Sequence, residues 1–231
     1  MIDKIQAFGD SFVYGTDLPD CRAPGGIDEK IVYSPSNLTW QALAAKELGL
    51  EYGCRADGGW GNQFIASRIF QHAKKGSLVM VNWSWIDRFD YMTDENQART
   101  LRPGEDTELE RFYYKNLHSE MFDKFRNLVT IWASIAWLRE RNIPFIMTIM
   151  DQLLLDDQWN VAPSMVDMQN EIRKYLTWFP ENRTFLEWSR ANGYPESEGW
   201  HPLEEAHAQA AKIMLPIIKS KINTHITTTQ G

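Results

Sequence analysis

The stretch Ile2-Asp3-Lys4-Ile5-Gln6-Ala7-Phe8-Gly9-Asp10-Ser11 carries the strongest fold signal in the chain. Its apolar residues, between Ile2 and Phe8, are typical of a β-strand that is buried in a sheet. Gly9 and Asp10 favour a turn directly after that strand. We therefore predict a strand over 2–8 that carries the Ser11 hydroxyl to its carboxyl end.

The rest of the chain alternates between strand-like and helix-like segments. Short apolar runs predict further strands over 51–55, 78–83, 144–149 and 184–186. Helical spacing and capping residues predict helices over about 36–48, 62–74, 108–141 and 165–178, and a last helix from Leu203. Strands that alternate with helices form a parallel sheet covered on both faces. We predict an α/β fold with about five parallel strands.

We expect a single domain over residues 1–222, with an irregular insertion over 87–107 and a flexible polar tail over 223–231.

In the long helix predicted over 108–141, several apolar residues lie three and four positions apart: Phe122, Phe125, Val129, Trp132 and Ala136. Trp40, Trp132 and Trp137 follow helical patterns of this kind and are interpreted as core residues.

Composition limits the classes of function. The 231 residues are 43% hydrophobic and 24% charged, with a net charge of -7, which gives no general attraction to nucleic acid or to anionic membranes. No signal-like or membrane-spanning run is present, so we expect a cytoplasmic protein. Cys21 and Cys54 are interpreted as thiols, although a single disulfide between them stays open.

A second informative segment lies near the other end of the chain, Glu198-Gly199-Trp200-His201-Pro202. It places a carboxylate three residues before a histidine. A serine hydroxyl becomes a good nucleophile when a histidine takes its proton, and the histidine works best when a carboxylate orients it. Ser11, His201 and Glu198 therefore form a candidate catalytic triad. The alternative is that Ser11 caps a helix and that His201 only begins one.

Gly9-Asp10-Ser11 near one end and Glu198-x-x-His201 near the other resemble the first and last sequence blocks of the SGNH, or GDSL-type, hydrolases. This resemblance covers the chain from end to end in block order. It implies a flavodoxin-like, three-layer fold and an esterase or lipase activity. It also implies that Ser11 is the nucleophile, His201 the base and Glu198 the acid, although the family usually has aspartate at the last position.

The resemblance further implies an oxyanion hole built from two later blocks. Gly59 matches the glycine of the second block, with Gly58 as the competing register. The third block departs from the family, because Ile86 stands where an oxyanion asparagine is expected. Three side chains could supply the missing donor: Asn62, which we favour, Asn82 and Ser84.

The predicted reaction is acyl transfer from a small ester to water, without a cofactor or metal. Residues expected to contact the substrate are Asp10, Trp60, Trp83, Ser84 and Trp200. The aromatic rings suit a carbohydrate ester as well as an acyl chain. Two alternatives remain: a binding protein with weak or no catalysis, and an acyltransferase that passes the acyl group to a sugar hydroxyl. We expect a small-molecule ester as partner and neither nucleic acid nor membrane; the sequence does not predict the oligomeric state.

Overall fold

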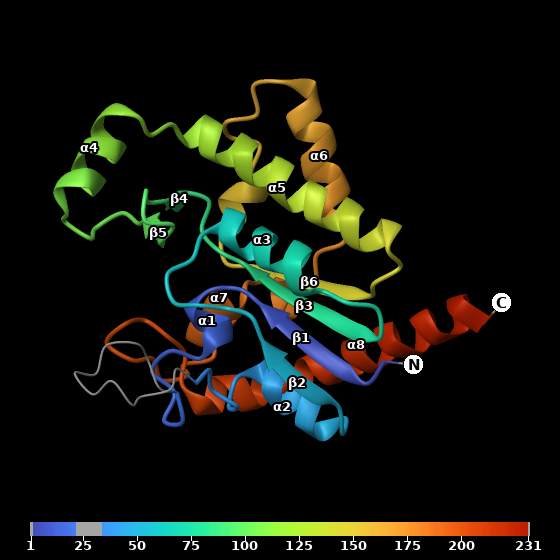
Figure 1. The fold of residues 1–231 in the computed structure, drawn as a ribbon. Helices are drawn as coiled ribbons and strands as arrows, with labels where there is room; N and C mark the ends of the chain where they lie inside the picture. The colour runs from blue at the N-terminus through green and yellow to red at the C-terminus, as the bar shows by residue number, and fades with distance from the viewer. Residues whose placement is uncertain (1, 22–33, 231) are drawn as a thin grey trace.

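The computed structural model describes residues 2–21 and 34–230. Its centre is a parallel sheet of four strands, β1 (Lys4–Phe8), β2 (Glu51–Cys54), β3 (Ser77–Trp83) and β6 (Phe145–Ile149), in the order β2-β1-β3-β6 (Figure 1). The register places Phe8 of β1 beside Val81 of β3. The predicted α/β class and the parallel sheet are confirmed, and the carboxyl ends of these strands meet at one edge.

Helices cover both faces of this sheet (Figure 1). On one face lie α2 (Trp40–Glu47) and α8 (Glu204–Gln230), and on the other lie α3 (Asn62–His72), α5 (Glu120–Glu140) and α6 (Pro163–Arg173). Successive residues of β3 point to opposite faces, so Leu78 packs in the α2–α8 core and Val79 packs in the α3–α5 core. β3 is buried along its whole length, as its continuous apolar run predicts.

The strand predicted over 184–186 is wrong. Thr184 instead caps the helix α7 (Phe185–Ala191), because its side chain accepts a hydrogen bond from Glu187 N while the Glu187 carboxylate accepts one from Thr184 N. The place beside β6 is taken by a single parallel bridge between Leu176 and Met147. This bridge shortens the helix predicted over 165–178, which ends at Arg173.

The segment predicted as an irregular insertion contains a β-hairpin formed by β4 (Phe89–Met92) and β5 (Ala98–Leu101). The helix predicted over 108–141 is two helices, α4 (Glu108–Asn116) and α5. Each begins with its own cap, since Thr107 accepts from Glu110 N and Ser119 accepts from Phe122 N. The continuous apolar pattern over 108–141 predicted one helix, but the second capping residue, Ser119, begins a separate helix.

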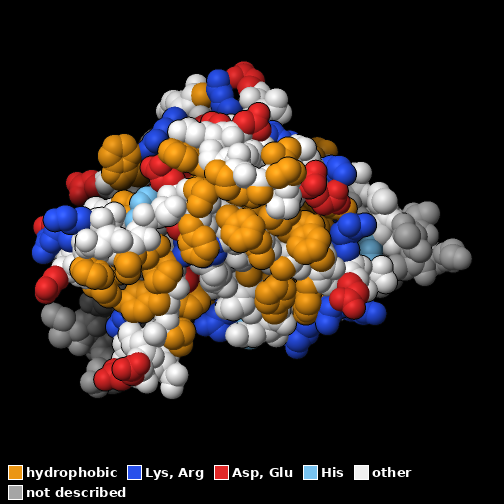
Figure 2. Space-filling model, turned by 90° about the horizontal axis from the view of Figure 1, so that it is seen from above, with side chains coloured by type: hydrophobic (Ala, Val, Ile, Leu, Met, Phe, Trp, Pro, Cys, Tyr) orange, Lys and Arg blue, Asp and Glu red, His pale blue; other side chains and the backbone are white. Residues whose placement is uncertain are grey.

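Helix α5 buries a different face from the one we expected. Its core residues are Leu128, Ile131, Ile135 and Leu138, each at most 2% exposed. The stripe predicted as core lies on the surface, and Trp132 is 45% exposed. Figure 2 shows the face that α4 and α5 cover, where apolar side chains gather. The large apolar residues that are exposed between positions 109 and 132 are Leu109, Phe112, Leu117, Met121, Phe122, Phe125, Val129 and Trp132.

The remaining elements are short or terminal. They are α1 (Ser11–Tyr14) and the 3-10 turns η1 (Gln152–Leu155) and η2 (Pro180–Asn182). Helix α8 runs on through residues 223–230, where we expected a flexible tail. Cys21 and Cys54 are free thiols. Within the described ranges, no helix is long and apolar enough to cross a membrane. Most of the Pro- and Gly-rich loop before α2 lies outside the described residues.

Candidate active site

Ser11 stands where β1 ends and α1 begins. Asp10 caps this short helix, because its Oδ1 accepts a hydrogen bond from Phe12 N at 3.1 Å. Gly9 allows the tight strand-to-helix turn, since a Cβ there would lie 2.4 Å from a Val13 methyl carbon. The turn leaves Ser11 largely buried but open to a cavity at the carboxyl edge of the sheet.

The structure brings Ser11 and His201 together. His201 Nε2 lies 2.9 Å from Ser11 Oγ, and His201 Nδ1 lies 2.7 Å from Asp17 Oδ2. The edge of the imidazole packs against Phe12, with ring centroids 5.2 Å apart. A hydroxyl, an imidazole and a carboxylate therefore form a continuous hydrogen-bonded line, with the geometry of a Ser-His-Asp triad.

The carboxylate that bonds to His201 is Asp17, so the prediction that Glu198 is the acid of the triad is wrong. Glu198 is exposed and bonds to none of the described residues, whereas Asp17 lies on the loop directly after α1. The backbone of Asp17 adopts a left-handed conformation, with φ of 71°. That conformation follows the end of α1, and no spacing in the sequence marks it, which is why motif reading missed this carboxylate.

Ser197 holds both partners of the Asp17–His201 pair. Its Oγ donates to Asp17 Oδ2 at 2.6 Å and accepts from the backbone N–H of His201 at 3.2 Å. The hydrogen bond from Ser197 is the largest cause that lowers the pKa of Asp17, followed by His201, while burial opposes both. Asp17 is therefore ionised at neutral pH, as the orienting carboxylate of such a line must be.

A cavity of about 450 Å³ opens beside Ser11 and His201. Gly58, Gly59 and Trp200 are among the residues that line it. The Gly59 backbone has a φ of 80°, which favours glycine, and a Cβ there would lie 2.7 Å from Arg102 Nη1. In the described structure, neither the Ser11 N–H nor the Gly59 N–H donates to another residue, so both are available to an oxyanion.

Asp90 of β4 fixes the glycine loop in place. Its Oδ1 accepts from Gly61 N and its Oδ2 accepts from Phe64 N, both at 2.9 Å. These N–H groups belong to the first turn of α3, whose cap residue Gly61 has no side chain to offer them. The hairpin of the insertion thus has a structural purpose, because it holds the loop that presents Gly59.

Asn62 does not fill the missing oxyanion position. Both hydrogens of its Nδ2 are used, one on Ser84 O at 3.1 Å and one on Asn127 Oδ1 at 2.7 Å, and its Oδ1 accepts from Ser84 N. The other two candidates are buried and do not line the cavity: Ser84 Oγ donates to Asp10 Oδ2, and Asn82 is 3% exposed, with an Nδ2 that has no partner in the described structure. Asn62 instead ties α3 to α5 and to the segment after β3.

Of the five residues expected to contact the substrate, only Trp200 lines the cavity. Asp10 and Trp83 are completely buried, and Ser84 is 3% exposed. Trp60 lines a neighbouring cavity, where Arg68 lies over its ring. The sequence interpretation failed here because position next to a catalytic block does not reveal which side of the backbone a side chain occupies.

The cavity also contains residues that the sequence did not single out. They are Phe12, Thr16, Trp85, Arg88, Leu186, Arg102 and Arg190. Arg88 reaches the carboxylate of Asp10 at 3.1 Å and lies over the Trp85 ring. The only signal for Arg88 was its place at the end of the altered third block, and nothing in the sequence marked Arg102 or Arg190.

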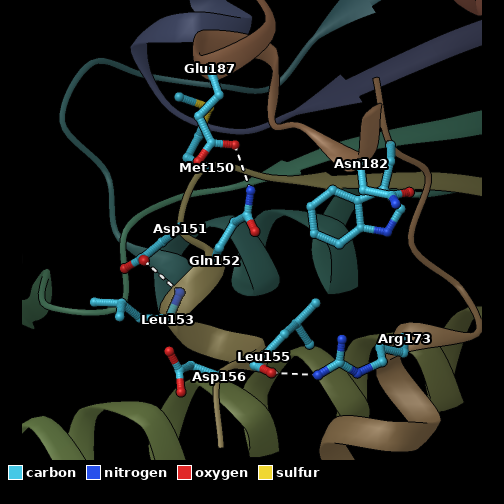
Figure 3. A pocket seen from close by; sticks show the side chains of 10 residues that line it. Met150, Asp151, Gln152, Leu153, Leu155, Asp156, Arg173, Asn182 and Glu187 are labelled. Carbon is cyan, nitrogen blue, oxygen red and sulfur yellow. Dashed lines mark hydrogen bonds between the residues drawn. The ribbon is translucent and has the colours of Figure 1, made fainter. Parts of the chain in front are cut away.

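A second cavity, of about 700 Å³, lies beyond the end of β6 (Figure 3). Its polar side chains are engaged with neighbouring groups: Gln152 donates to Glu187 at 2.6 Å, and Asp151 accepts from Leu153 N at 3.0 Å. No serine or histidine lines it, so the cavity beside Ser11 is the candidate active site. No group of three or more metal-ligating side chains clusters among the described residues.

No protein-family model matches the sequence, and no curated protein matches it. Solved structures do. An acetyl xylan esterase, Est2A, from the rumen bacterium Butyrivibrio proteoclasticus matches with a TM-score of 0.51 and 14% identity, over 95% of this chain and 64% of that one. A carbohydrate esterase family 2 enzyme with a carbohydrate-binding domain, from Corynascus thermopiles (Myceliophthora fergusii), matches with a TM-score of 0.53 and 13% identity, over 95% of this chain and 66% of that one.

The psychrotrophic esterase EstA from Pseudoalteromonas sp. matches with a TM-score of 0.53 and 10% identity, over 96% of this chain and 99% of that one. The chain spans slightly less than two thirds of the length of the two carbohydrate esterases. At these identities the likeness concerns the fold. The three-layer α/β fold that the sequence resemblance implied is thereby confirmed.

Proposed function

We propose that this protein is a serine-dependent ester hydrolase. The observation that carries the proposal is the line from Ser11 Oγ to His201 Nε2 and from His201 Nδ1 to Asp17 Oδ2, which lies beside a cavity. Each contact is within normal hydrogen-bond length. The esterases among the structural neighbours support the same reaction class at the level of the fold.

In the proposed reaction, His201 Nε2 takes the proton of Ser11 as Oγ attacks the ester carbonyl. Asp17 holds the imidazole in the tautomer that carries hydrogen on Nδ1 and stabilises its cationic form. The Ser11 and Gly59 N–H groups stabilise the negative oxygen of the tetrahedral intermediate. His201 then protonates the leaving alcohol, and a water molecule hydrolyses the acyl-enzyme by the same proton transfers in reverse.

The small cavity, with Trp85 and Trp200 in its lining, supports a short acyl group on a ring-shaped alcohol such as a carbohydrate. Two of the neighbours are carbohydrate esterases by their descriptions. A catalytically weak binding protein is the second candidate. It is favoured by the absence of the expected side-chain donor at Asn62, since loss of one oxyanion donor costs about 10²–10³ in turnover.

The test uses an activated acetyl ester and a fluorophosphonate probe that labels nucleophilic serines. We expect a burst of product from the wild-type protein and covalent labelling at Ser11, with both lost in Ser11→Ala. An acyltransferase would show the same burst but would yield an acylated sugar when a carbohydrate acceptor is added. Hydrolysis that persists unchanged in Ser11→Ala, or a folded wild-type protein that neither labels nor turns over, would contradict the proposal.

A further inference from the structure

The cavity beside Ser11 is lined by three arginines, Arg88, Arg102 and Arg190, and by no aspartate or glutamate of the described chain. The chain as a whole has a net charge of -7, so this lining is opposite in character to the rest of the protein. We propose that the site takes acyl esters of an anionic molecule and holds its carboxylate, sulfate or phosphate group with these guanidinium groups. This inference rests on the hydrolase function proposed above and names its substrate class.

Arg102 presents a free nitrogen beside the oxyanion loop. Its Nε and Nη2 both donate to Glu105 Oε1, the former at 2.6 Å. Its Nη1 has no acceptor among the described residues and lies 2.7 Å from the position a Cβ would take at Gly59. Glu105 therefore holds the guanidinium through Nε and Nη2 and leaves Nη1 beside Gly59 without a described acceptor.

Arg190, which lines the same cavity, is held in a similar way. Its Nε and Nη2 form a bidentate pair with Glu196, at 2.8 and 3.1 Å. Its guanidinium lies 5.2 Å from the centroid of the Trp200 ring, which lines the cavity with it. Nη1 has no acceptor in the described structure. The carboxylate and the indole fix the orientation of the side chain before any ligand binds.

Arg88 is the buried member of the set, with 11% of its side chain exposed. Its Nη1 donates to Asp10 Oδ2 at 3.1 Å and to Trp60 O at 2.8 Å, which leaves Nε and Nη2 without a described acceptor. Burial lowers the pKa of Arg88, the charge of Asp10 opposes this, and the charge of Arg102 adds a smaller lowering by repulsion. An anion between these two guanidinium groups would relieve that repulsion.

The three side chains thus share one arrangement. Each lines the cavity, donates part of its guanidinium group to an internal acceptor, and has at least one nitrogen without an acceptor among the described residues. Arginine is suited to this task because its N–H groups match carboxylate, sulfate and phosphate oxygens, and such charge-assisted hydrogen bonds are stronger than neutral ones. With a neutral ester these N–H groups would bond only to water, whereas an anionic group would give them charged acceptors.

The kinetic test compares two acetyl esters that differ in one group, an acetylated glucuronate and an acetylated glucose with the acetyl group on the same hydroxyl. We expect kcat/KM for the glucuronate ester to exceed that for the glucose ester by about tenfold or more at low ionic strength. Arg102→Gln and Arg190→Gln should each lower that ratio, chiefly through a higher KM for the anionic ester. Both side chains are 44% exposed, so the variants are expected to fold.

The matched control is Arg111→Gln, which removes an arginine that pairs with Asp106 on the surface outside the cavity. It should leave the ratio at its wild-type value. Arg190→Lys keeps the charge but not the fork and should restore the ratio only in part. Equal kcat/KM for the two esters in the wild-type protein, or a ratio that survives both glutamine variants, would overturn the inference.

A binding experiment separates this inference from the hydrolase proposal. Glucuronate, inorganic phosphate, inorganic sulfate and glucose are titrated calorimetrically into the Ser11→Ala protein, which cannot turn over. Heat with any of the anions but not with glucose, reduced in the Arg102→Gln and Arg190→Gln backgrounds, supports the anion site even if the wild-type protein shows no hydrolysis. Hydrolysis of neutral esters without binding of any anion leaves the hydrolase proposal intact and refutes the anion site.

Discussion

Asp17 is the residue on which the proposed chemistry depends most closely after Ser11 and His201. It accepts hydrogen bonds at a single oxygen, Oδ2, from both Ser197 and the imidazole. Because these contacts lower its pKa, the carboxylate keeps its charge well into the acid range. Only in that form can it hold hydrogen on Nδ1 and leave Nε2 free to take the serine proton.

Asp17→Asn should therefore lower kcat by about 10³–10⁴, since the amide stabilises the wrong tautomer and cannot offset the imidazolium charge. Glu198→Gln is the matched control and should change kcat less than twofold, because Glu198 is exposed and bonds to none of the described residues. Steady-state hydrolysis of an activated acetyl ester measures both. If Glu198→Gln were the damaging variant, the acid would be the one that the sequence motif suggested.

At this scale, the sequence located two residues that the structure brings within hydrogen-bond distance, and their catalytic roles stay predictions. Ser11 follows an apolar run, and His201 precedes a helix, so both could be located and paired before any coordinates. Asp17 could not, since a left-handed residue in a loop carries no periodic signal. The three arginines were missed for a related reason: they come from separate elements and meet only in the folded chain.

At the scale of elements, helix α5 shows the limit of reading one periodic pattern. Two apolar stripes run along it with the same three-and-four spacing, and periodicity alone cannot tell which one faces the sheet. The branched aliphatic stripe, which includes Leu128, is buried, while the stripe that includes Val129 and Trp132 is exposed. The central strands were easier to assign, because a strand that is buried on both faces does not require a choice of which face is buried.

The two faces of α5 should respond differently to truncation at neighbouring positions. Leu128→Ala should lower the free energy of unfolding by about 2–5 kcal/mol, because Leu128 is fully buried and its loss leaves a cavity. Val129→Ala should change it by no more than about 0.5 kcal/mol, since Val129 is 39% exposed. Urea denaturation of the two variants measures the difference, and equal losses would show that the exposed stripe is covered in solution.

At the scale of the whole molecule, the buried side chain of His207 links helix α8 to helix α2. His207 of α8 accepts a hydrogen bond at Nδ1 from the backbone N–H of Trp40 in α2, at 3.1 Å, and packs against Phe185. Burial, with a smaller effect of the charge on His201, lowers the pKa of His207 to about 3. The folded protein therefore keeps this imidazole neutral in a range where the unfolded chain protonates it.

Stability should consequently fall as the pH drops. The unfolded state binds a proton near pH 6.5 and the folded state only near pH 3, so the free energy of unfolding decreases with falling pH between those values. The expected loss from this group is about 2 kcal/mol between pH 6.5 and pH 5. Denaturation of the wild-type protein and of His207→Gln at both pH values isolates it, since the variant lacks that slope.

An NMR titration of the wild-type imidazoles provides a second measurement that needs no variant. His207 should stay neutral down to at least pH 4. A resonance of His207 that titrates near pH 6.5 would contradict the expected stability profile. The overall architecture was within reach of the sequence because alternating strands and helices allow few packings, whereas the contact between His207 and Trp40 depends on the tertiary structure.

The order of the proposed catalytic groups along the chain has a consequence for biosynthesis. Ser11 begins α1 and Asp17 follows that helix, while His201 lies between α7 and α8. A growing polypeptide on the ribosome thus contains the proposed nucleophile and acid long before it contains His201. In the proposed mechanism, Ser11 therefore gains its base only after His201 has been synthesised and α8 has packed against α2.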